Sequence, residues 1–362
     1  MSIQFILFLS FSSLVFSTFA QPVKSIPGEP QFHISDSGRI LNNPPFKNCH
    51  AATIVETGKD TLLYAWFGGE YEGAKNVSIW GCFRYMNKKD QWGQLTLLAQ
   101  GKDDSGAQPC WNPVLFKTSK GVIFLDYKVG PNPREWWAER KTSYDNGKTW
   151  YAAKRLPSPF LGPIKNKPVQ LKNETILYPS SIESKDQHSW TIHLEKTDAE
   201  GDHWQYISID CDSFGVIQPT ILKYGNDSLQ MLCRSKQNTI VQTWSFDQGR
   251  TWSLLTALAL PNPNSGIDAV TLNNGWQLLV YNPMLSGKEW WAGRSVLKVA
   301  ISKNGRDWKD IATLEDHNAG EYSYPAIIQD SRNRIHIAYT DNRKNIKFVD
   351  IILIEKNNNI KL

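Results

Sequence analysis

The sequence predicts an all-β protein, a six-bladed β-propeller built from four-stranded antiparallel blades. One observation is a tryptophan-terminated turn that recurs after intervals of 58, 54, 48 and 56 residues. A second is a set of six short β-type runs spaced at similar intervals, and a third is the near absence of helical periodicity. Repeats of this length that contain short strands and turn signals indicate a radial array of four-stranded units.

The turn has the pattern Ser-x-Asp-x-Gly-x-Thr-Trp, which occurs in full at Ser143–Trp150 and at Ser245–Trp252. We expect the Asp to accept backbone N–H bonds within the turn and the Gly to adopt a positive φ. The Trp should pack the loop against its own sheet. Degenerate copies end at Trp92, Trp204 and Trp308. Five copies of the turn therefore mark five blades.

The β-type runs each open with Ala or Pro after a polar or aromatic residue. They are His50–Val55, Asn112–Phe116, Lys167–Leu171, Gln218–Leu222, Asp268–Leu272 and Tyr324–Ile328. Pro is tolerated at the first position of a strand, where the ladder can lose an N–H. We predict that these runs are the innermost strands of six blades and that their first residues surround the central axis at one end.

Five turns and six inner strands agree if the last blade is closed by strands from both parts of the chain. Gln31–Ile40 would supply the N-terminal strand of this blade. Ile335–Tyr339 and Ile346–Ile352 would supply the C-terminal strands. Seven blades are the alternative count.

Residues Met1–Ala20 are uncharged and strongly apolar, and they end in a small residue. This pattern is typical of a secretory signal peptide, so we expect a secreted, extracellular protein, or a periplasmic one if the host is bacterial. Residues 21–362 then form a single propeller domain. No other apolar run is long enough to cross a bilayer, so no membrane span is expected.

Charge and residue spacing narrow the classes of partner. The formal net charge of +5 is compatible with an anionic substrate, and the lack of a Lys/Arg run argues against nucleic acid. The sequence has no metal-ligand spacing, so we expect no metal and no other cofactor. We expect the protein to be a monomer.

The starts of the six inner strands place polar and aromatic side chains around the predicted axial mouth. These are His50, Asn112, Lys167, Gln218, Asp268 and Tyr324, with Trp111, Asn166 and Tyr322 just before them. Small apolar residues would suffice for a purely structural propeller, so this ring indicates a funnel that binds a ligand. Structural explanations exist as well: His50 can be a packed histidine, and Asp268 can hold the turn before it.

With these Asp-box turns and inner strands, residues 45–353 resemble the sialidase superfamily, in the branch of sialidase-like proteins with BNR (Asp-box) repeats. The resemblance implies three arginines that clamp a substrate carboxylate, a Tyr nucleophile activated by a Glu, and an acidic acid/base residue. Arg234 matches the second arginine, and Arg294, 28 residues before Tyr322, matches the third. Tyr322-Ser323 resembles the nucleophile strand, and Tyr324 is the rival for the same role.

The sequence departs from the family pattern at two positions. His50-Ala51-Ala52 stands where the family has its first arginine, and Gln218 stands where the activating Glu is expected. A neutral amide cannot accept a proton as a carboxylate does. Glu70 and Glu72 lie in the loop where the acid/base Asp is expected, although outside its motif. Either of these two can instead be a solvated loop charge.

We therefore expect a glycoside hydrolase that removes terminal sugars from a glycan or glycoconjugate, as an exo-α-sialidase or a related glycosidase of acidic glycans. The expected catalytic residues are Tyr322, assisted by Asp268 or His50, and Glu70 or Glu72 as the proton donor. The expected substrate-binding residues are Arg234, Arg294, Gln218, Lys167, Asn112 and Trp111. An α-L-rhamnosidase-type propeller and a non-catalytic glycan-binding propeller are the alternatives, and Gln218 favours the second of them.

Overall fold

The protein is described by a computed structural model that covers residues 29–88, 91–289 and 291–354. Phe32–Leu353 forms one compact unit. The other unit comprises Met1–Gln31 and Ile354–Leu362, of which only residues 29–31 and Ile354 are described. The predicted signal peptide, Met1–Ala20, therefore lies outside the described residues. Within the described ranges the regular structure is entirely β-strand, and no helix there could span a bilayer.

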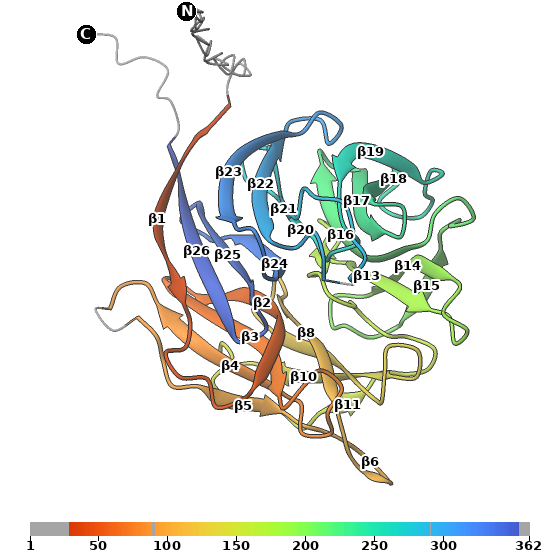
Figure 1. The fold of residues 1–362 in the computed structure, drawn as a ribbon. Coiled ribbons are helices and arrows are strands. Elements are labelled where there is room, and N and C mark those ends of the chain that lie inside the picture. The colour runs from red at the N-terminus through yellow and green to blue at the C-terminus, as the bar shows by residue number, and fades with distance from the viewer. Residues whose placement is uncertain (1–28, 89–90, 290, 355–362) are drawn as a thin grey trace, which may run out of the picture. The chain divides into compact units, whose positions relative to one another are not determined.

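Six four-stranded antiparallel sheets confirm the predicted six-bladed propeller (Figure 1). Blade A contains β2 (Asn48–Gly58), β3 (Thr61–Gly69), β4 (Ser78–Tyr85) and β5 (Thr96–Ala99). Blade B contains β8 (Cys110–Lys117), β9 (Ile123–Val129), β10 (Trp137–Ser143) and β11 (Lys154–Arg155). Blade C contains β12 (Val169–Gln170), β13 (Ile176–Glu183), β14 (Trp190–Thr197) and β15 (Gln205–Ser208).

The remaining blades follow the same order. Blade D contains β16 (Val216–Tyr224), β17 (Ser228–Ser235), β18 (Thr239–Ser245) and β19 (Thr256–Pro261). Blade E contains β20 (Asp268–Thr271), β21 (Gln277–Tyr281), β22 (Val296–Ser302) and β23 (Lys309–Asp316). Blade F contains β24 (Tyr322–Gln329), β25 (Arg334–Asp341), β26 (Asn345–Ile354) and β1 (Gln31–Arg39). A small hairpin of β6 (Gly101–Asp103) and β7 (Gly106–Gln108) lies between blades A and B in the sequence.

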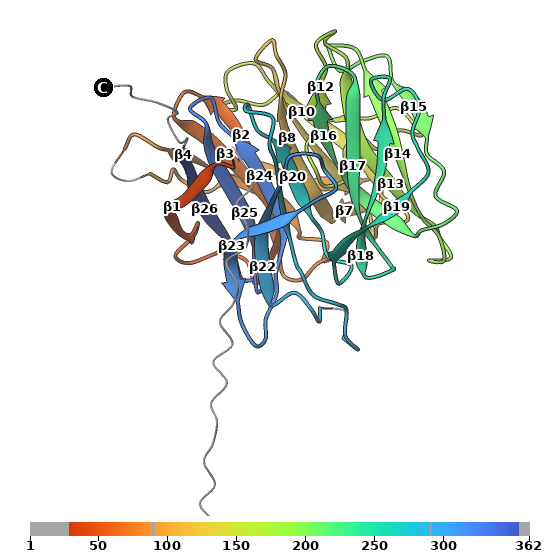
Figure 2. The ribbon, with the colours of Figure 1, turned by 90° about the horizontal axis from the view of Figure 1, so that it is seen from above.

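Blade F joins the two parts of the chain as predicted. β1 pairs with β26, and both Figure 1 and Figure 2 show the red strand β1 beside the blue strand β26. A buried ionic cluster reinforces this closure. Arg84 of blade A ion-pairs with Asp36 of β1 at 2.7 Å and with Asp350 of β26 at 2.8 Å, and Asp350 also hydrogen-bonds His336 at 2.7 Å.

The predicted inner strands open with a β-bulge in four blades. The residue at each bulge is not glycine yet has a positive φ: Ala51 (58°), Asn112 (37°), Gln218 (55°) and Tyr324 (53°). Bulges bend a strand and change the direction of its side chains, and non-glycine residues in this region are strained. The bulges also fix which residues occupy equivalent positions in the blades. His50 is equivalent to Trp111, Ile217 and Ser323, whereas the sequence pattern aligned it with Asn112, Gln218 and Tyr324, each one position later.

Blade C has a shorter inner strand than predicted. β12 covers only Val169–Gln170 rather than Lys167–Leu171. The preceding residues bond to other blades instead of to the blade C ladder. Lys165 Nζ donates to the carbonyls of Ile267 and Pro325, and Asn166 Nδ2 donates to that of Gln218.

The full Asp-box turns have the predicted internal bonds. In the first copy, Asp145 Oδ1 accepts the Thr149 N–H at 2.9 Å, and Gly147 has a φ of 82°. The tryptophan differs from our expectation because it does not pack on its own sheet alone. Trp150 packs in a core that includes Leu63 and Phe83 of blade A, so this turn joins neighbouring blades.

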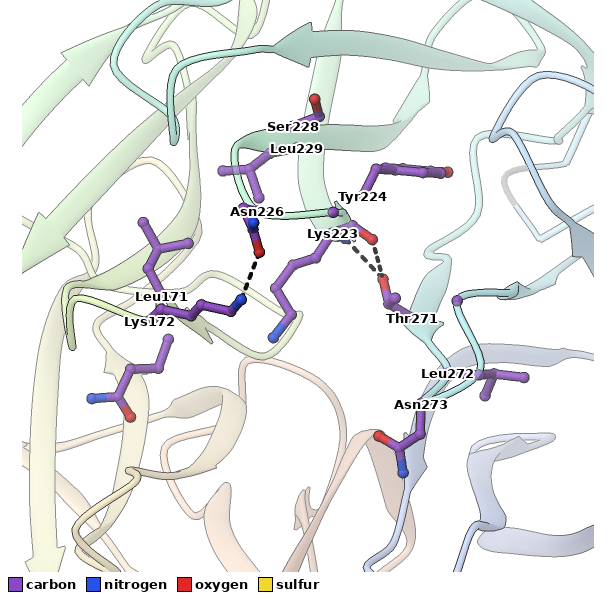
Figure 3. A pocket seen from close by; sticks show the side chains of 13 residues that line it. Leu171, Lys172, Lys223, Tyr224, Asn226, Ser228, Leu229, Thr271, Leu272 and Asn273 are labelled. Carbon is purple, nitrogen blue, oxygen red and sulfur yellow. Dashed lines mark hydrogen bonds between the residues drawn. The ribbon is translucent and has the colours of Figure 1, made fainter.

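A ring of polar bonds links all six blades at the end of the propeller where the inner strands finish. From blade to blade, the bonds are Lys117 Nζ to Thr57 O, Ser119 N to Gln170 Oε1, Lys172 Nζ to Asn226 Oδ1, Lys223 N to Thr271 Oγ1, Asn273 N to Gln329 Oε1, and Ser331 Oγ to Glu56 Oε1. Figure 3 shows the Lys172–Asn226 and Lys223–Thr271 links beside a cavity of 340 Å³ between blades C, D and E. The side chains of this end therefore serve largely to hold blades together.

Candidate functional site

The predicted axial mouth lies at the opposite end, where the inner strands begin. Because each blade is antiparallel, the loops between second and third strands open at the same end. This geometry brings together strand starts from several blades with the loops that carry Glu72, Arg294 and Arg343.

Arg234 of β17 is the centre of the polar contacts at the mouth. Its Nη1 donates to Tyr324 Oη at 2.6 Å and to Gln218 Oε1 at 3.2 Å, and its Nε donates to Asn264 Oδ1 at 2.9 Å. The residue is only 6% exposed. None of these three acceptors is a carboxylate. Among the described residues, the buried Arg234 guanidinium therefore hydrogen-bonds only neutral groups.

Tyr324, not Tyr322, is the tyrosine that the structure brings to Arg234. The Gln218 amide Nε2 lies 3.5 Å from Tyr324 Oη, at the position where the family resemblance places a carboxylate. Tyr322 has other surroundings, because its ring stacks on His317 with centroids 4.5 Å apart. The bulge between Ser323 and Ala326 turns the two tyrosines toward different neighbours.

His50 joins the same cluster. Its ring centroid is 4.1 Å from that of Tyr324, and its Nδ1 bonds Thr340 Oγ1 at 2.8 Å. Burial, and then the charges of Arg343 and Arg294, lower the pKa of His50 well below its usual value. The imidazole is therefore neutral near pH 7. Its Nε2 is buried and has no hydrogen-bond partner among the described residues.

Arg294 and Arg343 form a second cationic group around Glu321. Arg294 Nη1 donates to Glu321 Oε1 at 2.8 Å, and Arg343 Nε donates to Glu321 Oε2 at 2.7 Å. Burial raises the pKa of Glu321, but the bonds and charges of the two arginines outweigh it and hold the pKa below its usual value. Arg294 Nη2 also lies 3.5 Å from the Asn264 carbonyl oxygen, so Asn264 connects this group to Arg234.

The two glutamates of the blade A loop are placed differently. Glu72 ion-pairs with Arg343 and so belongs to the second group. Glu70 is exposed and lies 3.3 Å from Lys47 Nζ. The structure therefore brings Glu72, but not Glu70, to the arginines.

Asp268 and Lys167 are bound to each other and to the frame of the propeller. The Asp268 carboxylate accepts Lys167 Nζ at 2.9 and 3.0 Å, Thr220 Oγ1 at 2.8 Å and the Ile327 N–H at 2.9 Å. Asp268 is 2% exposed. Its oxygens thus connect blades C, D, E and F, a structural role that differs from the expected one of holding the turn before Asp268.

Lys165 is a buried cation close to the same mouth. Burial lowers the pKa of its ammonium to about 7. Its Nζ has three acceptors, of which Pro325 O is the nearest at 2.6 Å. Because all three of its N–H donors have acceptors, we treat Lys165 as part of the frame.

Trp111 and Asn112 line the blade B side of the mouth. Trp111 Nε1 donates to Gly130 O at 2.7 Å, and its ring makes an edge contact with Trp136. Asn112 is 5% exposed, and its side chain makes no hydrogen bond with the described residues.

Three residues of the mouth were missed from the sequence: Arg343, Glu183 and Arg134. All three lie at or next to loops that connect the second and third strands of a blade. The rule that these loops open at the mouth would have drawn attention to them, since Glu72 and Arg294 occupy such loops as well. Among the described residues, no group of His, Cys, Asp and Glu side chains is placed to hold a metal ion.

Comparison with known proteins gives a family and a fold. The family model of the BNR repeat-like domain matches residues 60–337. A protein of unknown function from Dyadobacter fermentans superposes with a TM-score of 0.73 at 15% identity, over 91% of this chain and 100% of that one. No curated protein sequence matched the chain.

Two sialidase structures are similar as well. The NanB sialidase of Streptococcus pneumoniae, as a K499G mutant, has a TM-score of 0.65 at 11% identity, over 86% of this chain and 69% of that one. The Trypanosoma rangeli sialidase has a TM-score of 0.67 at 13% identity, over 84% of this chain and 55% of that one. This chain thus spans just over half of the trypanosomal protein. At such identities the similarity shows the fold.

Proposed function

The chain belongs to the BNR repeat-like domain family, and from this premise we propose that it is a sialidase-like glycoside hydrolase. Its substrate is a glycan that ends in an acidic sugar. The sialidase-like fold supports the class of enzyme, and the residues of the mouth support the class of substrate.

The single observation that carries the proposal is the state of Arg234. A buried guanidinium with only neutral acceptors is ready to bind an anion, because guanidinium and carboxylate groups form paired charge-assisted hydrogen bonds. Arg294 and Arg343 lie nearby, and the charges of all three act on His50. A sugar carboxylate in the mouth would therefore meet the charge of Arg234, beside two further arginines whose charges are partly offset by Glu321 and Glu72.

Tyr324 takes the catalytic role that the sequence had assigned to Tyr322. Its hydroxyl is held by Arg234, and it attacks or stabilises the anomeric carbon of the bound sugar. Gln218 cannot accept the hydroxyl proton. The neutral His50 beside Tyr324 has no hydrogen-bond partner at Nε2 among the described residues, so it is the proposed proton acceptor in place of the absent glutamate. Because its lowered pKa makes it a weak base, the transfer also depends on the charge of Arg234, which favours the Tyr324 phenolate. Asp268 and Lys167 act as structural residues in this proposal.

The test is a panel of 4-methylumbelliferyl glycosides of sialic acid, glucuronic acid and L-rhamnose. We expect turnover of an acidic glycoside by the wild type. Tyr324→Phe should lose at least 100-fold in kcat while still binding the free sugar acid, and Tyr322→Phe should retain activity. Turnover confined to the rhamnoside would favour the rhamnosidase-type alternative instead.

A non-catalytic glycan-binding propeller is the second candidate. The observation that favours it is Gln218, an amide rather than a carboxylate, 3.5 Å from Tyr324 Oη. Under this alternative the protein binds an acidic sugar but hydrolyses no member of the panel. Calorimetric titration with the free sugar acids then shows whether a protein that hydrolyses nothing still binds an acidic sugar, as this alternative requires.

We also propose that the protein is exported after removal of Met1–Ala20. The apolar, uncharged pattern of this segment supports the proposal. Amino-terminal sequencing of protein recovered outside the cytoplasm should begin at Gln21. Recovery of the intact segment from the cytoplasm would contradict it.

A further inference from the structure

A glutamate of blade C lies at the mouth and has no bonding partner among the described residues. Glu183 is the last residue of β13, whose end opens at the axial mouth. Two residues earlier, Ser181 Oγ accepts the Gln218 N–H at 3.1 Å, so this face of the strand looks toward the inner strand of blade D. Side chains two positions apart share a face of a strand. Ile182 between them is 41% exposed, whereas Glu183 is half-buried on the Gln218 side.

Cations surround Glu183 without forming ion pairs to it. Its strand partner is Trp190, whose ring centroid lies 5.5 Å from Arg234 Cζ and 4.7 Å from Lys236 Nζ. Burial raises the pKa of Glu183, and the charges of Arg234, Arg134 and Lys236 lower it only in part. Within the described ranges, no hydrogen bond or ion pair holds its carboxyl group.

The other carboxylates considered for the mouth are all occupied. Glu72 and Glu321 are bound by arginines, Asp268 accepts several donors, and Glu70 lies beside Lys47. Carboxylates bonded in this way are less available to donate a proton to a substrate than a carboxyl group without such partners. A carboxyl group in a half-buried site without a bonded cation is, in contrast, easier to protonate, because burial disfavours its charged form, and it can then act as an acid.

We propose that Glu183 is the proton donor of the glycoside hydrolysis, an inference that rests on the proposed function. The carboxyl proton passes to the glycosidic oxygen as the bond between this oxygen and the anomeric carbon breaks, and the electron pair of the bond stays on the oxygen. The Glu183 carboxylate then takes a proton from the water that supplies the new hydroxyl group at the anomeric carbon. Arg234 Nη1 donates to Tyr324 Oη at 2.6 Å, and Arg234 Cζ lies 5.5 Å from the ring of Trp190, the strand partner of Glu183. A sugar acid bound to Arg234 would therefore lie near both groups.

The experiment compares Glu183→Gln with Glu135→Gln, a matched change in an exposed residue of the blade B loop. Each variant is assayed on two glycosides of the sugar that the wild type hydrolyses. The 4-methylumbelliferyl glycoside has a leaving group that needs little protonation, and the methyl glycoside has one that needs a proton. Loss of a general acid costs about 100- to 10,000-fold. We expect a loss of this size in kcat/KM for Glu183→Gln on the methyl glycoside, less than tenfold on the aryl glycoside, and no loss for Glu135→Gln.

The pH profile supplies a second readout. The alkaline limb of kcat/KM should disappear in Glu183→Gln on the aryl glycoside, because that limb reports the ionisation of the acid. Equal losses on both leaving groups, or an unchanged alkaline limb, would overturn the role of Glu183 and leave the proposed function standing. A wild type that hydrolyses no glycoside would overturn both.

Calorimetry with free N-acetylneuraminic acid tests the position of Glu183 without turnover. Ionisation of Glu183 adds a negative charge near Arg234, so wild-type affinity should fall as pH rises through the pKa of Glu183. Glu183→Gln should lose that fall in affinity, and Glu135→Gln should keep it. The same pH dependence in wild type and Glu183→Gln would place Glu183 outside the sugar site.

Discussion

Removal of the Asp350 charge should destabilise the closure of the propeller. Asp350 of β26 hydrogen-bonds His336 of β25 at 2.7 Å and ion-pairs with Arg84 of β4 at 2.8 Å. The three side chains are 0–3% exposed, and they join blade F to blade A. Asp350→Asn keeps the volume but leaves the Arg84 charge with Asp36 alone, whose side chain is 44% exposed.

The loss of folding free energy in Asp350→Asn arises because the buried Arg84 charge loses a partner. Removing one partner of a buried ion pair costs about 3–5 kcal/mol, because the other charge is left without compensation. Because unfolding entropy scales with chain length, this loss lowers the Tm of the unit Phe32–Leu353 by about 4–7 °C. The matched control is Glu200→Gln, whose exposed pair with Lys120 at 2.6 Å should contribute less than about 1 kcal/mol.

Differential scanning calorimetry at pH 6 measures both variants. We expect Asp350→Asn to melt several degrees below wild type and Glu200→Gln to melt within about 2 °C of it. If Asp350→Asn melted with the wild type, or if the two variants lost equal stability, the closure would not depend on this cluster.

Two further predictions concern buried charged groups. Burial opposes protonation of His336, but its bonds to Asp330 and Asp350 raise its pKa overall. Protonated His336 therefore stabilises the fold fully below about pH 6.5, the pKa of an unfolded histidine, and this stabilisation is lost as pH rises through the raised pKa. Urea midpoints of wild type should therefore fall more between pH 6 and pH 9 than those of His336→Gln, and parallel curves would contradict this. Asp268→Asn should cost about 3–5 kcal/mol, since Lys167 loses its charged partner and an NH2 group replaces one of the two oxygens that accept Lys167, Thr220 and the Ile327 N–H. A variant with wild-type Tm and no activity would instead assign Asp268 to catalysis.

The six-bladed architecture could be predicted from the sequence because the turns of each blade are formed by residues close together in the chain. The bonds within Ser143–Trp150 and the proline or alanine at each inner strand depend on residues adjacent in sequence, so repeated copies reveal the blades. The closure by β1 followed from counting strands. β12 was shorter than predicted because Lys165 and Asn166 bond to distant carbonyls, which no local pattern records.

The candidate site was less predictable because it depends on register and on loops. A bulge moves a strand by one residue, so His50 aligns with Trp111 rather than with Asn112, and Tyr324 rather than Tyr322 meets Arg234. Arg234 and Gln218 could be found because the family resemblance assigns a role to both positions. Arg343 and Glu183 could not, because their importance arises from contacts across blades.

The pairing of β1 with β26 has a consequence for biosynthesis. A ribosome makes β1 before any blade and makes β26 after all the other strands, so β1 has no partner while five blades emerge. Until the late strands follow, the nascent chain exposes the unpaired backbone and apolar side chains of an open edge. Co-translational folding should therefore stop short of a closed ring, and chaperones that shield strand edges should associate with this chain until translation ends.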